Sequence, residues 1–186
     1  MILKEMKTKT LGLIEELNPD SEYLTDDPDI QAKFNSTTNQ VMFEMARMKK
    51  MPGYVEMEVS EGDLIQYEDI AKASGYEVYQ LNVVRGVAHE LKASGTIIKA
   101  LESGTLEVDY FKYPEAITDK TSDSYEFELS ADALEIMPYG IAAHLLMSDV
   151  SANYGQIYAQ TYERMLQRLD SRYAMPMISF EGGVVI

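Results

Sequence analysis

The feature that most constrains this chain is a change in hydrophobic periodicity near Pro52 that reverses near Ser130. Outside these two points apolar residues recur every three or four positions, which is typical of amphipathic helices. Between them apolar and polar residues alternate in short runs separated by glycine-containing turns, which indicates antiparallel strands. The sequence therefore predicts an α+β fold: a small helical bundle from residues 1–51 and 129–175, an inserted antiparallel β subdomain from 52–128, and an extended C-terminal arm from 176–186.

Two helices are expected before Pro52. The first carries an apolar stripe and stops at Asn18-Pro19-Asp20, because proline and its neighbours break helices. The second begins at Asp27-Pro28, with the aspartate as cap and the proline in the first turn, and ends near Met51. The acidic link before it lacks the glycine and the terminal glutamate of a calcium-binding loop, so capping is the preferred interpretation. The stripe residues are Leu3, Met6, Leu13, Ile14 and Leu17, then Ile30, Phe34, Val41, Met45 and Met48.

The β subdomain is expected to contain four or five short strands. Candidates cover residues 54–59, 76–84, 95–99, 104–113 and 125–129, the last returning the chain to the helices. Along residues 106–113 both alternating sets mix apolar with polar side chains. This strand is therefore expected to contact something on each of its faces.

Two further helices are expected after Ser130. Pro138 can begin a helix, while Asp132 favours an earlier start through capping and the helix dipole. The second helix carries a tyrosine- and methionine-rich stripe that needs an apolar surface from this chain or from a neighbouring subunit. The predicted interaction residues are Tyr154, Tyr158, Tyr162, Met165 and Leu169, together with Met177, Ile178 and Phe180 of the arm.

The apolar C-terminal segment has two interpretations that the sequence leaves open. It either completes the sheet of its own chain or acts as an arm that adds a strand to a neighbour.

Composition excludes several classes of function. The chain has no cysteine, so it has neither disulfides nor thiolate metal sites. It lacks a signal-peptide pattern and a long apolar run, so we expect a soluble protein without membrane contact. The net charge is −15, and residues 52–128 hold sixteen acidic and six basic residues. Such a surface repels phosphates, which argues against a role in gripping nucleic acid. A simpler explanation is that the acids keep a tyrosine- and methionine-rich protein in solution.

No catalytic motif is found. The two histidines, His89 and His144, lack partners at ligand spacing, and nucleotide-binding and nucleophile-elbow motifs are absent. Acid pairs such as Glu107 with Asp109 imitate a glycosidase pair, but alternation on a solvated strand explains them more simply. We therefore expect no enzyme activity, no cofactor and no metal.

The helical parts of the chain resemble the adaptor, or head–tail connector, proteins of tailed bacteriophages and prophages. The resemblance lies in YFKYPEAIT at 110–118, SYEFELSADALEIMPYGIAAHLLMSD at 124–149, YAQTYERMLQRL at 158–169, and DPDIQAKFNSTTNQVMFEMARM at 27–48. It implies a structural subunit of the virion neck, present in the host cytoplasm during assembly. Such subunits form a ring between the portal and the tail-completion proteins, and DNA passes through it.

Within that interpretation, acids of the β subdomain are expected to line the channel and repel the DNA. Glu56, Glu58, Glu107 and Asp109 are the candidates, because they alternate along strands and can share one surface. An alternative of a different class is a carbohydrate- or small-ligand-binding module on the β insertion. Its stacking platform would be Tyr110, Phe111 and Tyr113.

Overall fold

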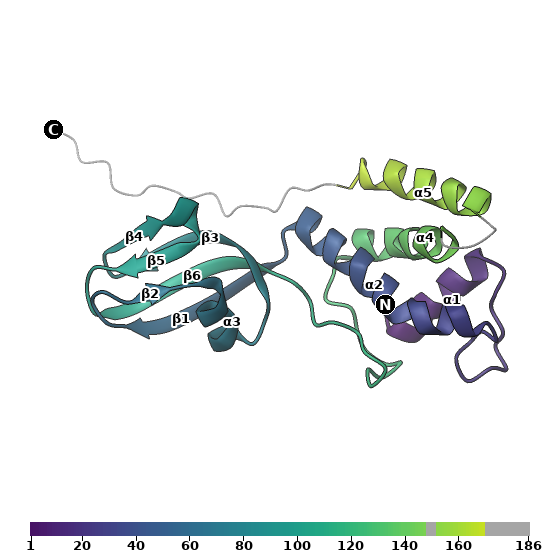
Figure 1. The fold of residues 1–186 in the computed structure, drawn as a ribbon, viewed down its shortest axis with the longest axis horizontal. Coiled ribbons are helices and arrows are strands. Elements are labelled where there is room, and N and C mark those ends of the chain that lie inside the picture. Colours follow the sequence, from purple (N-terminus) through teal and green to yellow (C-terminus); the bar gives the residue numbers. More distant parts are fainter. Residues whose placement is uncertain (148–151, 170–186) are drawn as a thin grey trace.

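The computed structural model describes residues 1–147 and 152–169, and it divides the chain into a helical unit and a β unit that lie side by side (Figure 1). The α+β fold expected from the sequence is confirmed. The helical unit contains α1 (Leu3–Leu13), α2 (Pro28–Lys49), α4 (Ala131–Leu146) and α5 (Ala152–Leu166). The β unit contains β1 (Pro52–Val59), β2 (Leu64–Ile65), α3 (Tyr67–Ser74), β3 (Val78–Gly86), β4 (His89–Lys92), β5 (Ile97–Ala100) and β6 (Gly104–Lys112).

Helix α4 is the centre of the helical unit and contacts α1, α2 and α5. Buried residues occur all round it, from Ala133 to Leu145, as expected for a helix enclosed by others. It begins directly after Ser130, so the earlier of the two predicted starts is confirmed. The helix start predicted at Pro138 is wrong, because this proline is buried inside α4. Pro138 leaves the carbonyl of Leu134 without its usual helical donor, which the packing around the helix tolerates.

Helix α2 follows its sequence signals closely. The carboxylate of Asp27 accepts hydrogen bonds from the backbone N–H groups of Asp29 and Ile30, at 2.8 and 3.3 Å, which is the expected N-cap. The helix ends at Lys49, and Lys50 adopts a left-handed conformation with φ of 50° before the chain enters β1. One face, which includes Phe34, Val41 and Met45, is buried in the helical core.

Residues 113–130 belong to the helical unit, so the predicted boundary of the β insertion at residue 128 is wrong. The side-chain amide of Asn39 donates to the carbonyl of Ile117 at 2.8 Å and accepts from its N–H at 2.7 Å. Ile117 and Phe127 are buried in the helical core. The strand predicted at 125–129 is also wrong. This segment is extended, but it forms only an isolated bridge between Ile2 and Glu126, because the chain beside it is the start of α1 rather than a strand.

The β unit consists of two three-stranded antiparallel sheets, with strand orders β1-β6-β3 and β2-β5-β4. The sheets and α3 share one core, which includes Ile65, Ile70, Ile98, Leu106 and Val108. Helix α3 was not predicted. At its N-terminus the Gln66 N–H donates a hydrogen bond to the Asp69 carboxylate at 3.0 Å, and at its C-terminus the helix is capped by Gly75, whose φ is 79°.

An aromatic cluster joins the two units. Tyr79 of β3 and Tyr113, just after β6, have ring centroids 4.9 Å apart, and Phe43 of α2 lies 4.9 Å from Tyr113. The Tyr79 hydroxyl donates to the carbonyl of Ala46 at 3.1 Å, and Arg47 donates to the Tyr113 hydroxyl. Leu106 and Val108 of β6 lie in the β core, and Tyr113, just after this strand, lies in the helical core. The prediction that β6 makes contacts on both faces holds only at its C-terminal end, where Phe111 is buried, because Glu107 and Asp109 earlier on the same face are not buried.

Candidate functional site

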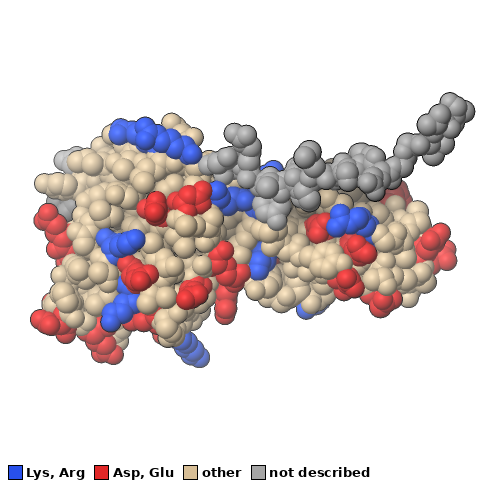
Figure 2. Space-filling view, turned by 180° about the vertical axis from the view of Figure 1, so that it is seen from behind, with Lys and Arg blue, Asp and Glu red and all other residues tan. Residues whose placement is uncertain are grey.

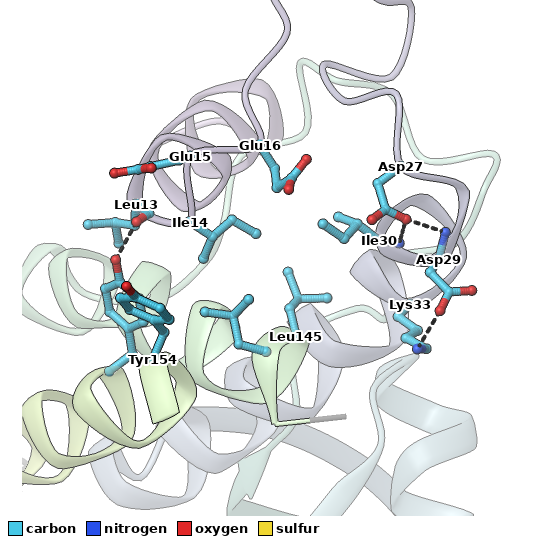
Figure 3. A pocket seen from close by; sticks show the side chains of 12 residues that line it. Leu13, Ile14, Glu15, Glu16, Asp27, Asp29, Ile30, Lys33, Leu145 and Tyr154 are labelled. Atoms are coloured by element: carbon cyan, nitrogen blue, oxygen red, sulfur yellow. Dashed lines mark hydrogen bonds and ion pairs between the residues drawn. The ribbon is translucent and has the colours of Figure 1, made fainter. Parts of the chain in front are cut away.

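A pocket of about 430 Å³ lies at the end of the helical unit, between the end of α1, the start of α2, the end of α4 and the start of α5 (Figure 3). We call it the bundle-end pocket. Its volume falls within the range of ordinary ligand pockets. Its apolar lining consists of Leu13, Ile14, Ile30, Leu145 and Leu146, with Tyr154 and Tyr158 on one side.

The rest of the lining is strongly acidic. Glu15, Glu16, Asp27 and Asp29 surround the apolar side chains, and Lys33 is the one basic residue that lines the pocket among the described residues. Lys33 is already engaged by Asp29, at 3.2 Å from its carboxylate. The pocket therefore combines an apolar interior with an excess of negative charge, which favours a cationic group carried on an apolar stem.

Two tyrosines of α5 hold this helix to the bundle. The Tyr158 hydroxyl donates to the carbonyl of Leu13, and the Tyr162 hydroxyl donates to the Glu44 carboxylate at 2.7 Å. Burial, followed by this hydrogen bond, raises the pKa of Tyr162 far above its ordinary value. Gly140 of α4 permits the close approach, because a Cβ at that position would lie 2.6 Å from the Tyr162 ring.

Most of the predicted interaction stripe on α5 is thus covered by its own chain. Tyr162 and Leu169 are buried, Tyr158 and Met165 are half-buried, and only Tyr154 is exposed, at 67%. The expectation that this stripe faces a neighbour is therefore corrected, since α4 packs along it and its tyrosines donate to Leu13 of α1 and Glu44 of α2. Met177, Ile178 and Phe180 lie outside the described residues, and so does the choice between the two interpretations of the arm.

The exposed apolar residues at this end of the bundle are different ones. Met147, at the end of α4, and Ile157, on α5, each expose 59% of their surface, and Ile157 lies one turn from Tyr154. Gly155 packs against the end of α4, where a Cβ would lie 3.2 Å from the backbone nitrogen of Met147. An apolar surface therefore continues from the bundle-end pocket onto the outer side of α5.

The four acids proposed for the channel lie on one face of the sheet β1-β6-β3, which we call the acidic sheet face. Glu56 of β1 is directly opposite Glu107 of β6, and Tyr54 is opposite Asp109. Residues directly opposite or two apart share a face, so Glu58 belongs to the same surface. The other face of β6 is buried, through Leu106, Val108 and Tyr110.

Each acid on this face has a partner within the chain. Arg85 of β3 lies 2.5 Å from the Asp109 carboxylate and 3.6 Å from that of Glu107. Tyr54 donates to Glu56 at 2.6 Å, which raises the pKa of the tyrosine to about 12, and Thr105 donates to Glu58 at 2.7 Å. With four carboxylates and one guanidinium, the face keeps an excess of negative charge. Acidic side chains are also scattered over both units on the face shown in Figure 2.

No arrangement of catalytic or metal-binding residues emerges from residues 1–147 and 152–169. These ranges contain no group of three or more histidine, aspartate or glutamate side chains that could hold a metal ion. His89 contacts the carbonyl of Val87 at 2.9 Å, and His144 is half-buried in α4. No helix in the described ranges is long and apolar enough to cross a membrane.

The stacking platform suggested for a ligand-binding β module is not available. Tyr110, Phe111 and Tyr113 expose only 2%, 4% and 7% of their surfaces. Tyr110 packs in the β core, and Tyr113 packs in the helical core. Rings that are buried in this way cannot stack on a sugar.

Sequence reasoning missed the bundle-end pocket because its walls come from four segments that are distant in the chain. A signal was nevertheless present. Leu13 and Ile14 continue the apolar stripe of α1 beyond its last buried residue, Leu11, and Ile30 is a partly buried apolar residue in the first turn of α2.

The comparisons with known proteins do not identify the chain: no protein-family model and no curated protein matches it.

Proposed function

We propose that this chain is an adaptor, or head–tail connector, subunit of a tailed bacteriophage or prophage. In this role it forms a ring between the portal and the tail-completion proteins of the virion neck, and DNA passes through the ring. The proposal builds on the resemblance of the helical segments, and it assigns the chain a structural rather than an enzymatic role.

The observation that carries this proposal is the apolar surface at the end of the bundle. Tyr154, which lines the pocket, and Ile157, one turn further along α5, each expose more than half of their surface, and so does Met147 at the end of α4. Clustered exposed apolar side chains next to a cavity are typical of protein–protein contact. A ring subunit needs such a surface for its neighbour or for the portal.

The acidic sheet face supports the second part of the proposal. Glu56, Glu58, Glu107 and Asp109 share one surface of the β unit, with Arg85 as their cationic neighbour. Repetition of this surface around a ring would sum the negative potential on the axis, although salt screens it beyond about 8–10 Å. DNA would then pass through without adhering to the wall.

Electron microscopy of the purified chain, alone and mixed with portal rings from the same phage or prophage, tests this function. We expect rings with an axial channel, on the portal if not in isolation, and the acidic sheet face directed toward the axis. A chain that remains monomeric at high concentration and binds no portal contradicts the proposal. Rings in which all four acids lie on the outer surface contradict the assignment of the channel acids alone.

A further inference from the structure

The chemistry of the bundle-end pocket selects arginine among the common side chains. Glu15 and Glu16 provide carboxylates that form no ion pair with another described residue, and a carboxylate pairs with a guanidinium in bidentate fashion. Asp27 caps α2 and Asp29 pairs with Lys33, so these two add negative charge at the rim. Tyr154 and Tyr158 provide rings on which a guanidinium stacks. The apolar interior accommodates the methylene stem. A lysine ammonium would use the charge and can lie over an aromatic ring, as Lys112 lies over Tyr76, but it cannot make the planar bidentate pairing.

The chain itself carries two arginines suited to this pocket. Among the described residues there are four arginines, and two are engaged within the chain: Arg47 with Tyr113, and Arg85 with Glu107 and Asp109. Arg164 and Arg168 are exposed and form no ion pair with another described residue. Arg164 is in the last turn of α5 and Arg168 is in the turn that follows, so both lie at the C-terminal end of this helix.

The pocket and these arginines lie at opposite ends of α5. Tyr154 and Tyr158 are in the first half of the helix, whereas Arg164 is in its last turn and Arg168 follows its last residue, Leu166. The separation from Tyr154 to Arg168 is about 20 Å at ~1.5 Å per residue, too far for Arg168 to reach the pocket of its own copy. Arg164 is about 9 Å along the axis from Tyr158, but six residues turn the helix by about 240°, so the two side chains leave α5 on different sides.

We propose that the bundle-end pocket receives Arg164 and Arg168 of a second copy of this chain. The pocket carries an excess of carboxylates, so the two surfaces are complementary in charge. Because donor and acceptor are different surfaces of one molecule, the contact is head-to-tail, and such contacts close into rings when the rotation between copies permits. The closure of these contacts into a ring, as distinct from an open filament, rests on the proposed function.

Site-specific cross-linking tests the contact. The chain has no cysteine, so a Lys33→Cys, Gln167→Cys variant carries a single thiol at the pocket rim and a single thiol beside the arginines. Both replaced residues are exposed, and all four rim carboxylates remain. Treatment with a short bismaleimide at high protein concentration should give a ladder of dimers, trimers and larger species on a denaturing gel.

Matched variants define the result. Each single-cysteine variant should remain uncross-linked, because a head-to-tail contact brings together unlike positions only. Adding Arg164→Glu and Arg168→Glu to the double-cysteine variant should reduce the ladder at least tenfold, and adding Glu15→Lys and Glu16→Lys to that variant should restore it. Circular dichroism confirms that each variant folds. The restoration separates a charge contact from a loss of structure.

Three outcomes overturn the inference: no ladder, a ladder that is insensitive to charge reversal, or dimers from the single-cysteine variants, which indicate a symmetric contact. Portal binding is measured separately, by co-sedimentation of the unmodified chain with portal rings. Portal binding without a ladder refutes the arginine contact and leaves the proposed function standing. A charge-dependent ladder without portal binding refutes the function and leaves the contact standing.

Discussion

At the scale of single residues, the Tyr162 hydroxyl is the clearest case of a polar group that holds an element in place. It is buried and donates to Glu44 at 2.7 Å, so the neutral tyrosine is favoured in the folded state and its pKa is raised. We predict that Tyr162→Phe lowers the free energy of unfolding by about 1 kcal/mol at pH 7, the usual net value of one hydrogen bond.

The same residue predicts a pH dependence. A raised pKa means that the stabilisation is complete below the unfolded value, near 10, and is lost as the pH rises above it. The difference in stability between the wild type and Tyr162→Phe should therefore shrink between pH 10 and pH 11. Urea unfolding of both proteins at pH 10 and pH 11 measures this difference. The ionisation of the other tyrosines affects both proteins equally, so it cancels in the difference. A difference that does not change with pH would contradict a buried, hydrogen-bonded hydroxyl.

A second residue-scale prediction concerns Asp132, in the first turn of α4. Lys49 donates to its carboxylate at 2.6 Å, and this hydrogen bond is the largest cause that lowers the pKa of Asp132. Because the carboxyl is half exposed, Asp132→Asn should cost only about 0.5–1 kcal/mol at pH 7. A carboxyl whose pKa is lowered by folding stabilises the folded state above its unfolded pKa. The difference in the free energy of unfolding between the wild type and Asp132→Asn should therefore begin to shrink as the pH falls below ~4 and be smaller at pH 3 than at pH 7.

Denaturant titrations at pH 7 and pH 3 check this prediction. Glu102→Gln is the control, since Glu102 is exposed and forms no ion pair with the described residues. If Asp132→Asn changes the free energy of unfolding at pH 7 by no more than Glu102→Gln does, the ion pair between Asp132 and Lys49 contributes nothing to stability.

At the scale of elements, the packing of α5 on α4 depends on a missing side chain. A Cβ at Gly140 would lie 2.6 Å from the Tyr162 ring, whereas a Cβ at Gly12 of α1 would meet nothing within 4 Å. We predict that Gly140→Ala destabilises the protein by about 1–3 kcal/mol through overpacking. Gly12→Ala should stabilise it by about 0.5–1 kcal/mol, because alanine favours the helix.

Thermal unfolding of the two variants tests both predictions. The comparison is matched because each variant replaces a helical glycine with alanine. Equal shifts in the melting temperature would show that α5 does not rest on Gly140 as described. A Gly140→Ala, Tyr162→Ala double variant should recover part of the loss due to overpacking, measured against Tyr162→Ala alone.

The elements also show which sequence signals suffice. Local signals decided the start of α2, where Asp27 and Pro28 act within one turn, and the strands β1 and β6, where alternation spans a whole element. Tyr125 and Phe127 alternate in the same way, but α1 lies beside them, and alternation alone does not supply a partner strand. The stripe of α5 was recognised correctly as apolar. Whether α4 or a neighbour covers it depends on Gly140 and Glu44, which are distant in sequence.

At the scale of the whole molecule, the described residues form two cores that share no buried residue. All buried residues of the β core lie between Val59 and Tyr110, and the helical core draws on α1, α2, α4, α5 and the segment after β6. The chain enters and leaves the β unit at adjacent points, because the Lys112 N–H donates to the Met51 carbonyl at 2.9 Å. The β unit is thus inserted at one place on a helical unit that is continuous around it.

This arrangement predicts that the helical unit folds without the β unit. A variant in which Gly-Gly joins Met51 to Lys112 should keep its helical circular dichroism and unfold cooperatively. Its melting temperature should fall, because Tyr79 no longer contacts Tyr113 or the carbonyl of Ala46. Tyr79→Ala in the full chain is the matched control and should account for a large part of that fall. The isolated β unit, at about sixty residues, is near the size at which one core is marginal, so it should be the weaker of the two. Loss of a cooperative transition in the joined helical variant would show that the two cores fold as one.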